Sequence, residues 1–215
     1  MVRKQKKAKR MSLLSFLSSS TRVAVLDASV VINLNATAVA AEIFGAFPNV
    51  FAITENAFDE LKRGISKGYD DAAFVQRHVD AGTLKLVSIP TVQLDTYEDL
   101  VSGTASSTLD DGEAATIACS IGLGAVAAID ERKALTICSQ RFPKLPVFST
   151  AELLLSDIVG KTLGPEAHQI ALMNALQKAR MRVPFDLAPA IITIIGSENA
   201  SQCSSLPKGL RQPSE

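Results

Sequence analysis

The sequence predicts an α/β protein, a three-layer α/β/α sandwich with a central parallel sheet. Five short runs rich in Val, Ile and Leu recur with little polar alternation, which is typical of strands buried on both faces of a parallel sheet. Helical patterns separate these runs and give a β-α-β-α order. Hydrophobic residues make up 47% of the 215 residues, which is enough for one domain with a sizeable core.

The expected strands are the five apolar runs themselves. Each is shorter than a typical helix and is rich in residues that favour strands. Right-handed crossovers between parallel strands would carry the intervening helices to the two faces of the sheet. The runs cover residues 23–26, 50–53, 84–89, 125–129 and 145–148.

Helices are expected between the strands. Residues 54–66 place Ala57, Phe58, Leu61 and Ile65 on one stripe, which predicts an amphipathic helix with a buried face. Further helical patterns cover residues 70–80, 111–122 and 131–142.

The C-terminal part of the chain turns helical. Ser149 and Glu152 have the spacing of a capping box, which predicts a helix running through Ile158. Gly164 and Pro165 are expected to end it and to start the next helix, because Pro suits a first helical turn. A final apolar helix is expected over residues 185–195, although its Ile-rich run also fits a strand.

The predicted layout has four segments. They are a disordered basic tail, a main α/β domain, C-terminal helices packed on that domain and a disordered polar tail. Their limits are residues 1–20, 21–160, 161–196 and 197–215.

The net charge of zero hides a division along the chain. Six of the 22 bases lie in the first ten residues, which contain no acid, so 16 bases remain against 22 acids and the rest carries −6. The basic tail has three interpretations: an electrostatic arm for RNA or another polyanion, a solvated leader, or an upstream start that precedes a native Met11.

The remaining composition favours a cytoplasmic protein. The three cysteines are odd in number and form no CxxC pair, which fits a reduced compartment. The apolar run 13–17 is too short for a secretory signal, and no run approaches membrane-spanning length. His78 and His168 are isolated, and we interpret both as surface residues that bind no metal.

Four acidic residues carry the functional prediction. Asp27 follows the first strand run and Asp130 follows the fourth, at the strand ends beyond which ligands bind in open parallel sheets. Glu60 and Glu113 lie on helical stretches between them. A cluster of carboxylates repels itself unless a cation neutralises it, and oxygen ligands suit Mg²⁺ or Mn²⁺. The leading hypothesis is therefore a metal-dependent phosphodiesterase.

Each acid also has a structural explanation. Asp27 and Asp130 could cap the helices that follow them. Glu113 has capping-pair spacing with Asp110 and would complement the helix dipole. Glu60 could belong to a solvated helix face.

Four stretches of the chain resemble the PIN-domain family, close to the VapC-type toxin nucleases. The resemblance implies an α/β/α fold and an acidic quartet, Asp27, Glu60, Glu113 and Asp130, that binds Mg²⁺ or Mn²⁺ and cleaves RNA, with Ser29 as the small hydroxyl residue near the first acid. It also implies a possible antitoxin partner and a homodimer. The stretches are VLDASVVINL (25–34), ITENAFDEL (53–61), LDDGEAATIACSIG (109–122) and AAIDERKA (127–134).

The chain departs from this pattern in two places. The third acid is Glu113 where Asp is common, with Asp110 and Asp111 as competitors. Ala128 stands where a hydroxyl residue often precedes the fourth acid by two.

Direct metal ligands are expected to be Asp27, Glu113 and Asp130, with Glu60 as ligand, base or outer-shell group. Plausible phosphate contacts, which could equally form a solvated face, are Lys62, Arg63 and Lys133.

Two other classes of function compete with a nuclease. A PIN fold without turnover could serve as an interaction module. A haloacid-dehalogenase-like phosphatase would need a second Asp two residues after the first, where this chain has Ser29. A dinucleotide site is a poor fit because Gly122 and Gly124 precede a strand instead of following one.

Overall fold

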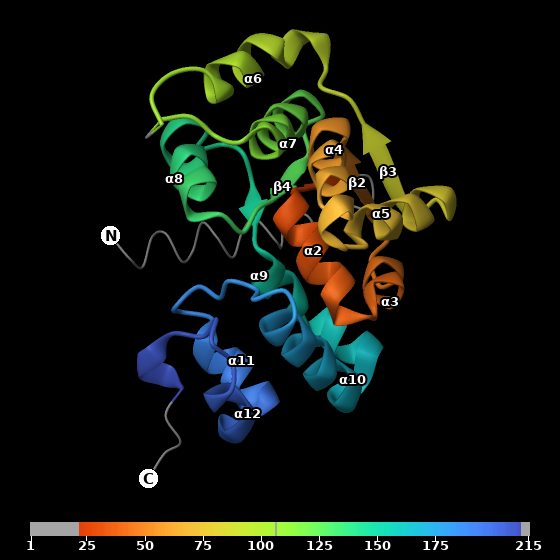
Figure 1. Ribbon diagram of the computed structural model, residues 1–215, viewed down its shortest axis with the longest axis vertical. Coiled ribbons are helices and arrows are strands. Elements are labelled where there is room, and N and C mark those ends of the chain that lie inside the picture. Colours follow the sequence, from red (N-terminus) through yellow and green to blue (C-terminus); the bar gives the residue numbers. More distant parts are fainter. Residues whose placement is uncertain (1–21, 106, 212–215) are drawn as a thin grey trace. The chain divides into compact units, whose positions relative to one another are not determined.

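The computed structural model describes residues 22–105 and 107–211, so the basic tail predicted at residues 1–20 lies outside the described residues. The first of its two compact units is built on a five-stranded, all-parallel sheet in the order β3-β2-β1-β4-β5 (Figure 1). It confirms all five predicted strands and the α/β/α class. The strands are β1 (Val23–Leu26), β2 (Val50–Thr54), β3 (Leu84–Val87), β4 (Val126–Ala128) and β5 (Val147–Phe148).

The strand order contains one switch of direction. From β1 the chain adds β2 and then β3 on one side, and it then crosses to β4 and β5 on the other side. The switch point therefore lies between β1 and β4, where open α/β sheets form their binding crevices. The register pairs Leu26 with Ala128, so these two strands end almost level.

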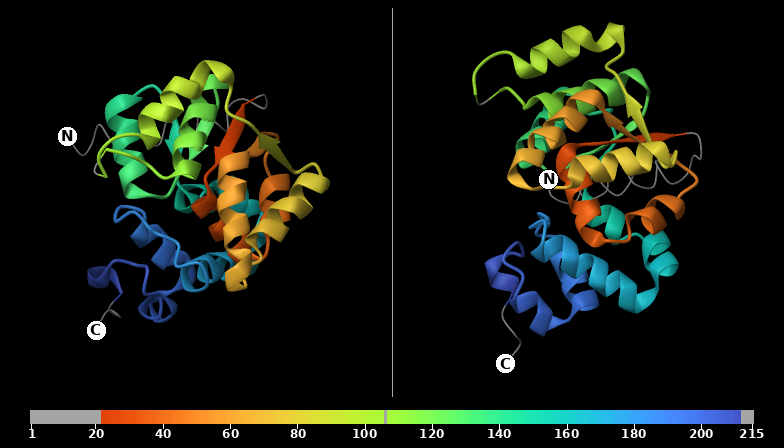
Figure 2. Two further views of the ribbon diagram at one scale, coloured as in Figure 1. Left: turned by 45° about the horizontal axis from the view of Figure 1, so that its top comes forward. Right: turned by 45° about the vertical axis from the view of Figure 1, so that its right-hand side comes forward.

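Five helices accompany the strands in the first compact unit, which comprises residues 22–31 and 47–148 as described. The most buried of them is α7 (green in Figure 2), which contacts β1, β2 and β4 of the sheet and also helices α4 and α6. This contact with both sides of the switch point fixes the start of α7 near the strand ends. The helices are α4 (Glu55–Arg63), α5 (Asp71–Asp80), α6 (Leu94–Val101), α7 (Asp111–Gly122) and α8 (Arg132–Arg141).

Predicted and observed helices differ in detail within this unit. The helix predicted over residues 54–66 ends at Arg63, and a 3-10 turn, Ile65–Lys67, follows. Ile65, expected on the buried stripe, is 58% exposed because it lies past this break. Apolar spacing alone could not locate the break at Gly64.

The second compact unit comprises residues 32–46 and 149–211 as described. Helix α2 (Ala28–Thr37) begins in the first unit and ends in the second. The domain limits predicted at residues 21, 160 and 196 remain predictions. The other helices are α3 (Ala40–Gly45), α9 (Thr150–Leu154), α10 (Asp157–Gln177), α11 (Ala188–Ile195) and α12 (Ser197–Ser201).

The C-terminal helices begin and end only in part where the sequence predicted. Ser149 and Glu152 form the capping box, and α11 is a helix, as predicted. The helix expected to run through Ile158 ends at Leu154, and α10 begins anew because the Ser156 hydroxyl caps it by accepting from the Val159 amide at 3.3 Å. Gly164 breaks α10 as expected, with φ 74°.

Two further predictions were wrong. Residues 197–211 are not a disordered tail, since they include α12 and a 3-10 turn, Lys208–Leu210, and bury Ala200, Cys203 and Leu206. The polar composition concealed these apolar residues. His168 is a buried residue instead of a surface one, and one of its ring nitrogens lies 2.7 Å from the Leu154 carbonyl oxygen.

Within the described residues no helix is long and apolar enough to cross a bilayer.

Candidate active site

The carboxyl ends of β1 and β4 bring Asp27 and Asp130 to the switch point of the sheet. The Asp27 amide donates to the Ala128 carbonyl at 3.0 Å, which extends the β1–β4 pairing by one bond. Asp130 follows two residues after Ala128. Both side chains are buried, Asp27 at 3% exposure and Asp130 at 6%. Two carboxylates buried at adjacent strand ends are unusual because a buried charge is costly unless it is compensated.

The two carboxylate oxygens of Asp27 have different surroundings. Oδ2 accepts from the Ser29 hydroxyl at 2.6 Å and from the Ser29 amide at 3.2 Å, so Asp27 also caps α2. Oδ1 is buried and has no hydrogen-bond partner within the described residues. Burial raises the pKa of Asp27, the hydrogen bonds from Ser29 and a weaker interaction with the Ala28 amide lower it, and the charge of Asp130 raises it to a smaller extent. One oxygen of the carboxylate is therefore held in place and the other is left unsatisfied.

Glu113 combines a capping role with a place near Asp27. It lies buried in the first turn of α7, and its Oε2 accepts from the Asp110 amide at 3.4 Å in a capping box. Burial raises the pKa of Glu113 to about 7, with the Asp27 charge as the next cause. The capping interpretation and the cluster interpretation therefore both hold for this residue.

Glu60 reaches the same region from α4. Its side chain is exposed, yet partial burial raises its pKa, and the charge of Asp27 raises it further. The carboxylate lies against Gly112 at the start of α7, where a Cβ on residue 112 would be 2.7 Å from Glu60 Oε2 and 3.2 Å from the Cα of Ala57. Helices α4 and α7 therefore approach closely only because residue 112 is glycine.

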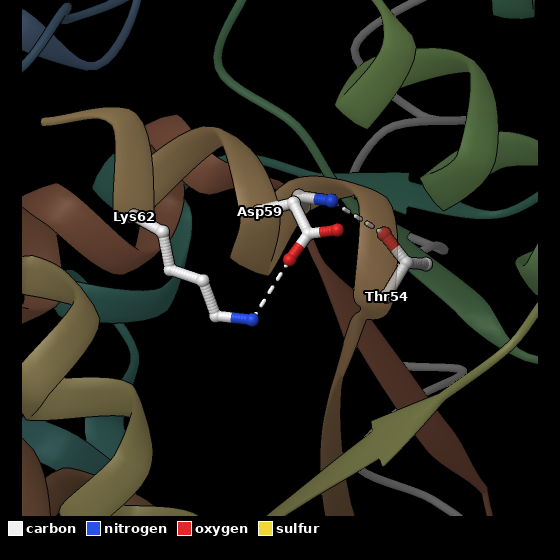
Figure 3. Close-up of polar contacts among 4 residues, drawn as sticks. Thr54, Asp59 and Lys62 are labelled. Atoms are coloured by element: carbon white, nitrogen blue, oxygen red, sulfur yellow. Dashed lines mark hydrogen bonds and ion pairs between the residues drawn. The ribbon is translucent and has the colours of Figure 1, made fainter.

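The entry into α4 is fixed by Thr54 at the end of β2. Its hydroxyl accepts from the Ala57 amide at 3.1 Å and caps the helix (Figure 3). Because β2 neighbours β1 in the sheet, this cap starts α4 at the same edge that carries Asp27.

The third-acid competitors are arranged differently from Glu113. Asp111 accepts a hydrogen bond from the Tyr97 hydroxyl. It also accepts from Asn56 Nδ2, which lies 3.2 Å from Oδ1 and 3.3 Å from Oδ2 of Asp111. The bond to Asp111 raises the pKa of Tyr97 to about 12. This network ties α4, α6 and α7 together. Asp110 is exposed, so neither competitor shares the burial of Glu113.

The four predicted acids fit a hard divalent cation in their chemistry. Carboxylate oxygens are the ligands that Mg²⁺ and Mn²⁺ prefer, and the buried Asp27 Oδ1 is an oxygen without a donor. Across residues 22–105 and 107–211, however, no three Asp, Glu, His or Cys side chains stand together in an arrangement that could hold an ion. The carboxylates would have to turn toward one another to share one.

The predicted phosphate contacts already have partners in two cases. Lys62 Nζ lies 2.8 Å from Asp59 Oδ1 (Figure 3) and over the ring of Phe58. Lys133 Nζ donates to the Ala105 carbonyl at 2.6 Å. For Lys62 the alternative of a solvated helix face therefore describes the structure better.

The sequence interpretation missed three residues around the cluster. Gly112 provides the close approach of α4, while Asn56 and Tyr97 hold Asp111. A glycine between two acids at a helix start was a usable signal, because glycine in a helix costs stability unless something approaches it. Nothing local marked Tyr97 as a partner of Asp111.

A family model described as a PIN domain matches residues 23–197, which include all four acids. No curated protein and no solved structure matches the chain.

Proposed function

This chain belongs to the PIN-domain family, a nuclease-type fold, and on that premise we propose that it is a metal-dependent endoribonuclease that hydrolyses RNA phosphodiester bonds. The observation that carries the proposal is Asp27. Its carboxylate is buried at the switch point of the sheet beside Asp130, and its Oδ1 has no donor among the described residues. A cation is the partner that would satisfy this oxygen and reduce the repulsion between the acids.

Asp27, Glu113 and Asp130 are the proposed ligands of Mg²⁺ or Mn²⁺. When bound, such an ion lowers the pKa of a bound water and stabilises negative charge on the phosphate.

The side chains around the ligands have separate proposed roles. Ser29 holds Oδ2 of Asp27, which directs Oδ1 toward the cluster. Glu60 is exposed and its raised pKa suits a group that takes a proton from the attacking water at its carboxylate. Gly112 lets Glu60 come close enough to do so.

We also propose that the protein is the toxin of a toxin–antitoxin pair and that it forms a homodimer. Both ideas rest on the VapC resemblance. The apolar surface of residues 184–195 could serve either a dimer or the core of this chain, and α11 buries Ile191 and Ile195. A dimer would therefore use other residues of that helix or another surface. Expression of the wild-type chain should arrest growth, and Asp130→Ala should relieve it; persistent toxicity of that variant counts against the toxin proposal.

The enzymatic proposal is tested with the purified full chain. We expect it to cut RNA in Mn²⁺ or Mg²⁺ and to be inactive in EDTA. Single-stranded and structured RNA are both offered as substrates. Asp27→Asn keeps an oxygen for the Ser29 bonds and should fold normally while losing cleavage. Cleavage by Asp27→Asn at the wild-type rate would refute the assignment of the site.

An interaction module without turnover is the second candidate. The observation in its favour is that no three acids stand in an ion-holding arrangement within the described residues. It predicts RNA or protein binding that EDTA leaves unchanged, together with no cleavage in any divalent ion. A dehalogenase-like phosphatase stays remote, since the Ser29 hydroxyl bonds Asp27 where that chemistry needs a second carboxylic acid.

A further inference from the structure

The second half of α10 and the connection from α10 to α11 (Figure 1) are rich in basic residues. Residues 167–185 contain three Lys or Arg residues and no Asp or Glu, whereas the chain beyond its first ten residues has a net charge of −6. The flanking acids are Glu166 and Asp186. This stretch therefore offers a local attraction for a polyanion within a part of the chain whose net charge is negative.

Two of these bases, Lys178 and Arg180, are exposed and have no ion-pair partner within the described residues. Lys178 directly follows the last residue of α10, Gln177, and its charge also complements the helix dipole. Arg180 has no such role, because it lies beyond the helix end. Its guanidinium is thus available for a charged partner.

Arg180 adopts a backbone conformation that an arginine rarely takes. Its φ is +54°, in the left-handed region where glycine is preferred at helix ends. The turn is closed by the Met181 amide, which donates to the Ala175 carbonyl at 2.9 Å, and Met181 and Val183 are buried. Glycine would fit this turn without strain, so the arginine side chain is kept at a cost that the fold itself does not require.

An exposed aromatic ring follows in the same connection. Phe185 is 69% exposed, five residues after Arg180 in the chain. An exposed ring and exposed cations in one short segment are the combination that binds single-stranded nucleic acid, since bases stack on the ring and phosphates meet the cations. A duplex would offer no free base faces to the ring.

We propose that Lys178, Arg180 and Phe185 form a binding surface for single-stranded RNA, with the two cations on phosphates and the ring under a base. This inference rests on the proposed function only in naming RNA as the polyanion. It concerns the second unit by itself and needs no metal ion. The two proposals can therefore fail separately.

The test measures binding of a fluorescent single-stranded oligoribonucleotide to the full chain by anisotropy, in EDTA so that nothing is cut, across a series of salt concentrations. Arg180→Gly removes the charge and relaxes the turn. We expect it to weaken binding by about tenfold, to lower the slope of log affinity against log salt by about 0.7, and to leave Tm unchanged or slightly raised. Arg180→Asn, which also tolerates the left-handed region, should weaken binding equally.

Matched variants separate charge from stacking. Arg180→Lys should retain most of the affinity. Phe185→Leu keeps an apolar side chain but loses the ring, and it should weaken binding by about tenfold with an unchanged salt slope. Arg141→Gln removes one charge from a side chain paired with Asp99 at 3.8 Å, and it should leave binding near the wild-type value.

Three results would overturn the proposal. The first is an absence of RNA binding by the wild-type chain, and the second is wild-type affinity in both Arg180→Gly and Phe185→Leu. The third is competition by inorganic polyphosphate equal to that by RNA, with no loss of affinity in Phe185→Leu, which would indicate a plain anion site. RNA binding through these residues without Mn²⁺-dependent cleavage would support the surface and refute the nuclease. Mn²⁺-dependent cleavage together with unaltered RNA binding in Arg180→Gly and Phe185→Leu would support the nuclease and refute the surface.

Discussion

The strand-end acids and the helix-borne acids reach the same cluster by different routes. Asp27 and Asp130 are placed by the register of β1 and β4, and each is buried as soon as its strand ends. Glu60 and Glu113 are placed by helices, one through close packing over Gly112 and the other through a capping box with Asp110. Position in a sheet is thus set by backbone hydrogen bonds, whereas position on a helix depends on what the helix packs against.

This difference implies different sensitivity to change. A strand-end acid is tied to the switch point by the backbone hydrogen bonds of the sheet, so its short side chain can rotate but cannot move away from that point. A helix-borne carboxylate can withdraw by a side-chain rotation, and Glu60, which is exposed, can do so most easily. We therefore expect the two kinds of acid to differ in how much activity they control.

The largest effect should come from the strand-end pair. Asp27→Asn and Asp130→Asn should each lower Mn²⁺-dependent cleavage by about 10³-fold or more, because each removes a proposed metal ligand that no neighbour can replace. Glu60→Gln should cost clearly less. Single-turnover cleavage with thermal melts as a folding control provides the comparison. An equal loss in all three variants would remove the distinction between the two routes.

The sequence was sufficient for the sheet because its signal is local. Buried parallel strands appear as uninterrupted apolar runs, so β1 to β5 could be located within a few residues. Composition misled for residues 197–211, where Ala200, Cys203 and Leu206 are buried among polar neighbours. Cys203 Sγ lies 4.0 Å from Met173 Sδ, 30 residues earlier in the chain, a contact that local composition cannot report.

The residues of the site likewise divide into those that the local sequence predicts and those that helix packing places. A strand that ends on Asp27 predicts a site by itself, given where α/β sheets bind ligands. The local pattern around Glu60 indicates only a solvated helix face, and its place beside Gly112 emerges from the packing of α4 on α7. The hydroxyl of Tyr97 on Asp111 is likewise a contact between helices that no local pattern encodes.

The next largest effect should come from Ser29, which holds the strand-end acid. Ser29→Ala removes the 2.6 Å bond to Asp27 Oδ2 and leaves the amide bond in place. We expect Mn²⁺ affinity to fall by about 10–100-fold, as is usual when a group that orients a ligand is lost. Calorimetric titration measures it, and Ser29→Thr should restore most of the affinity. Wild-type affinity in Ser29→Ala would mean that the cap alone orients Asp27.

A smaller effect is expected from closing the approach between α4 and α7. Gly112→Ala places a Cβ 2.7 Å from Glu60 Oε2 and 3.2 Å from Ala57 Cα, so the carboxylate must move and the backbone must adjust. We expect a destabilisation of about 1–3 kcal/mol and a modest loss of Mn²⁺ affinity. Gly45→Ala is the matched control, because no atom lies within 4 Å of the added Cβ.

The effect of Gly112→Ala on Mn²⁺ affinity should depend on Glu60. In a Glu60→Ala background, Gly112→Ala should no longer change Mn²⁺ affinity, although the contact with Ala57 keeps part of the stability loss. An unchanged affinity loss in that background would show that residue 112 acts on the cluster without Glu60.

The smallest effect is expected for Glu113, the helix-borne acid that is buried. In metal-free protein the pKa of Glu113 is raised to about 7 from an ordinary 4.5, first by burial and then by Asp27. A carboxyl group with a raised pKa adds stability below its unfolded pKa and loses that contribution as pH rises through the folded one. Wild-type stability should therefore fall between about pH 4.5 and 7 relative to Glu113→Gln, which keeps an oxygen for the Asp110 amide.

Thermal melts in EDTA from pH 5 to 8 measure this difference. The Tm of Glu113→Gln minus that of the wild type should grow by a few degrees as pH rises, while Glu98→Gln, which removes an exposed carboxylate, should give a nearly constant difference. Parallel curves for Glu113→Gln would mean that its carboxylate is as well solvated as a surface acid. The helix-borne pair would then offer no buried charge for a cation to neutralise, and the strand-end pair alone would have to bind the ion.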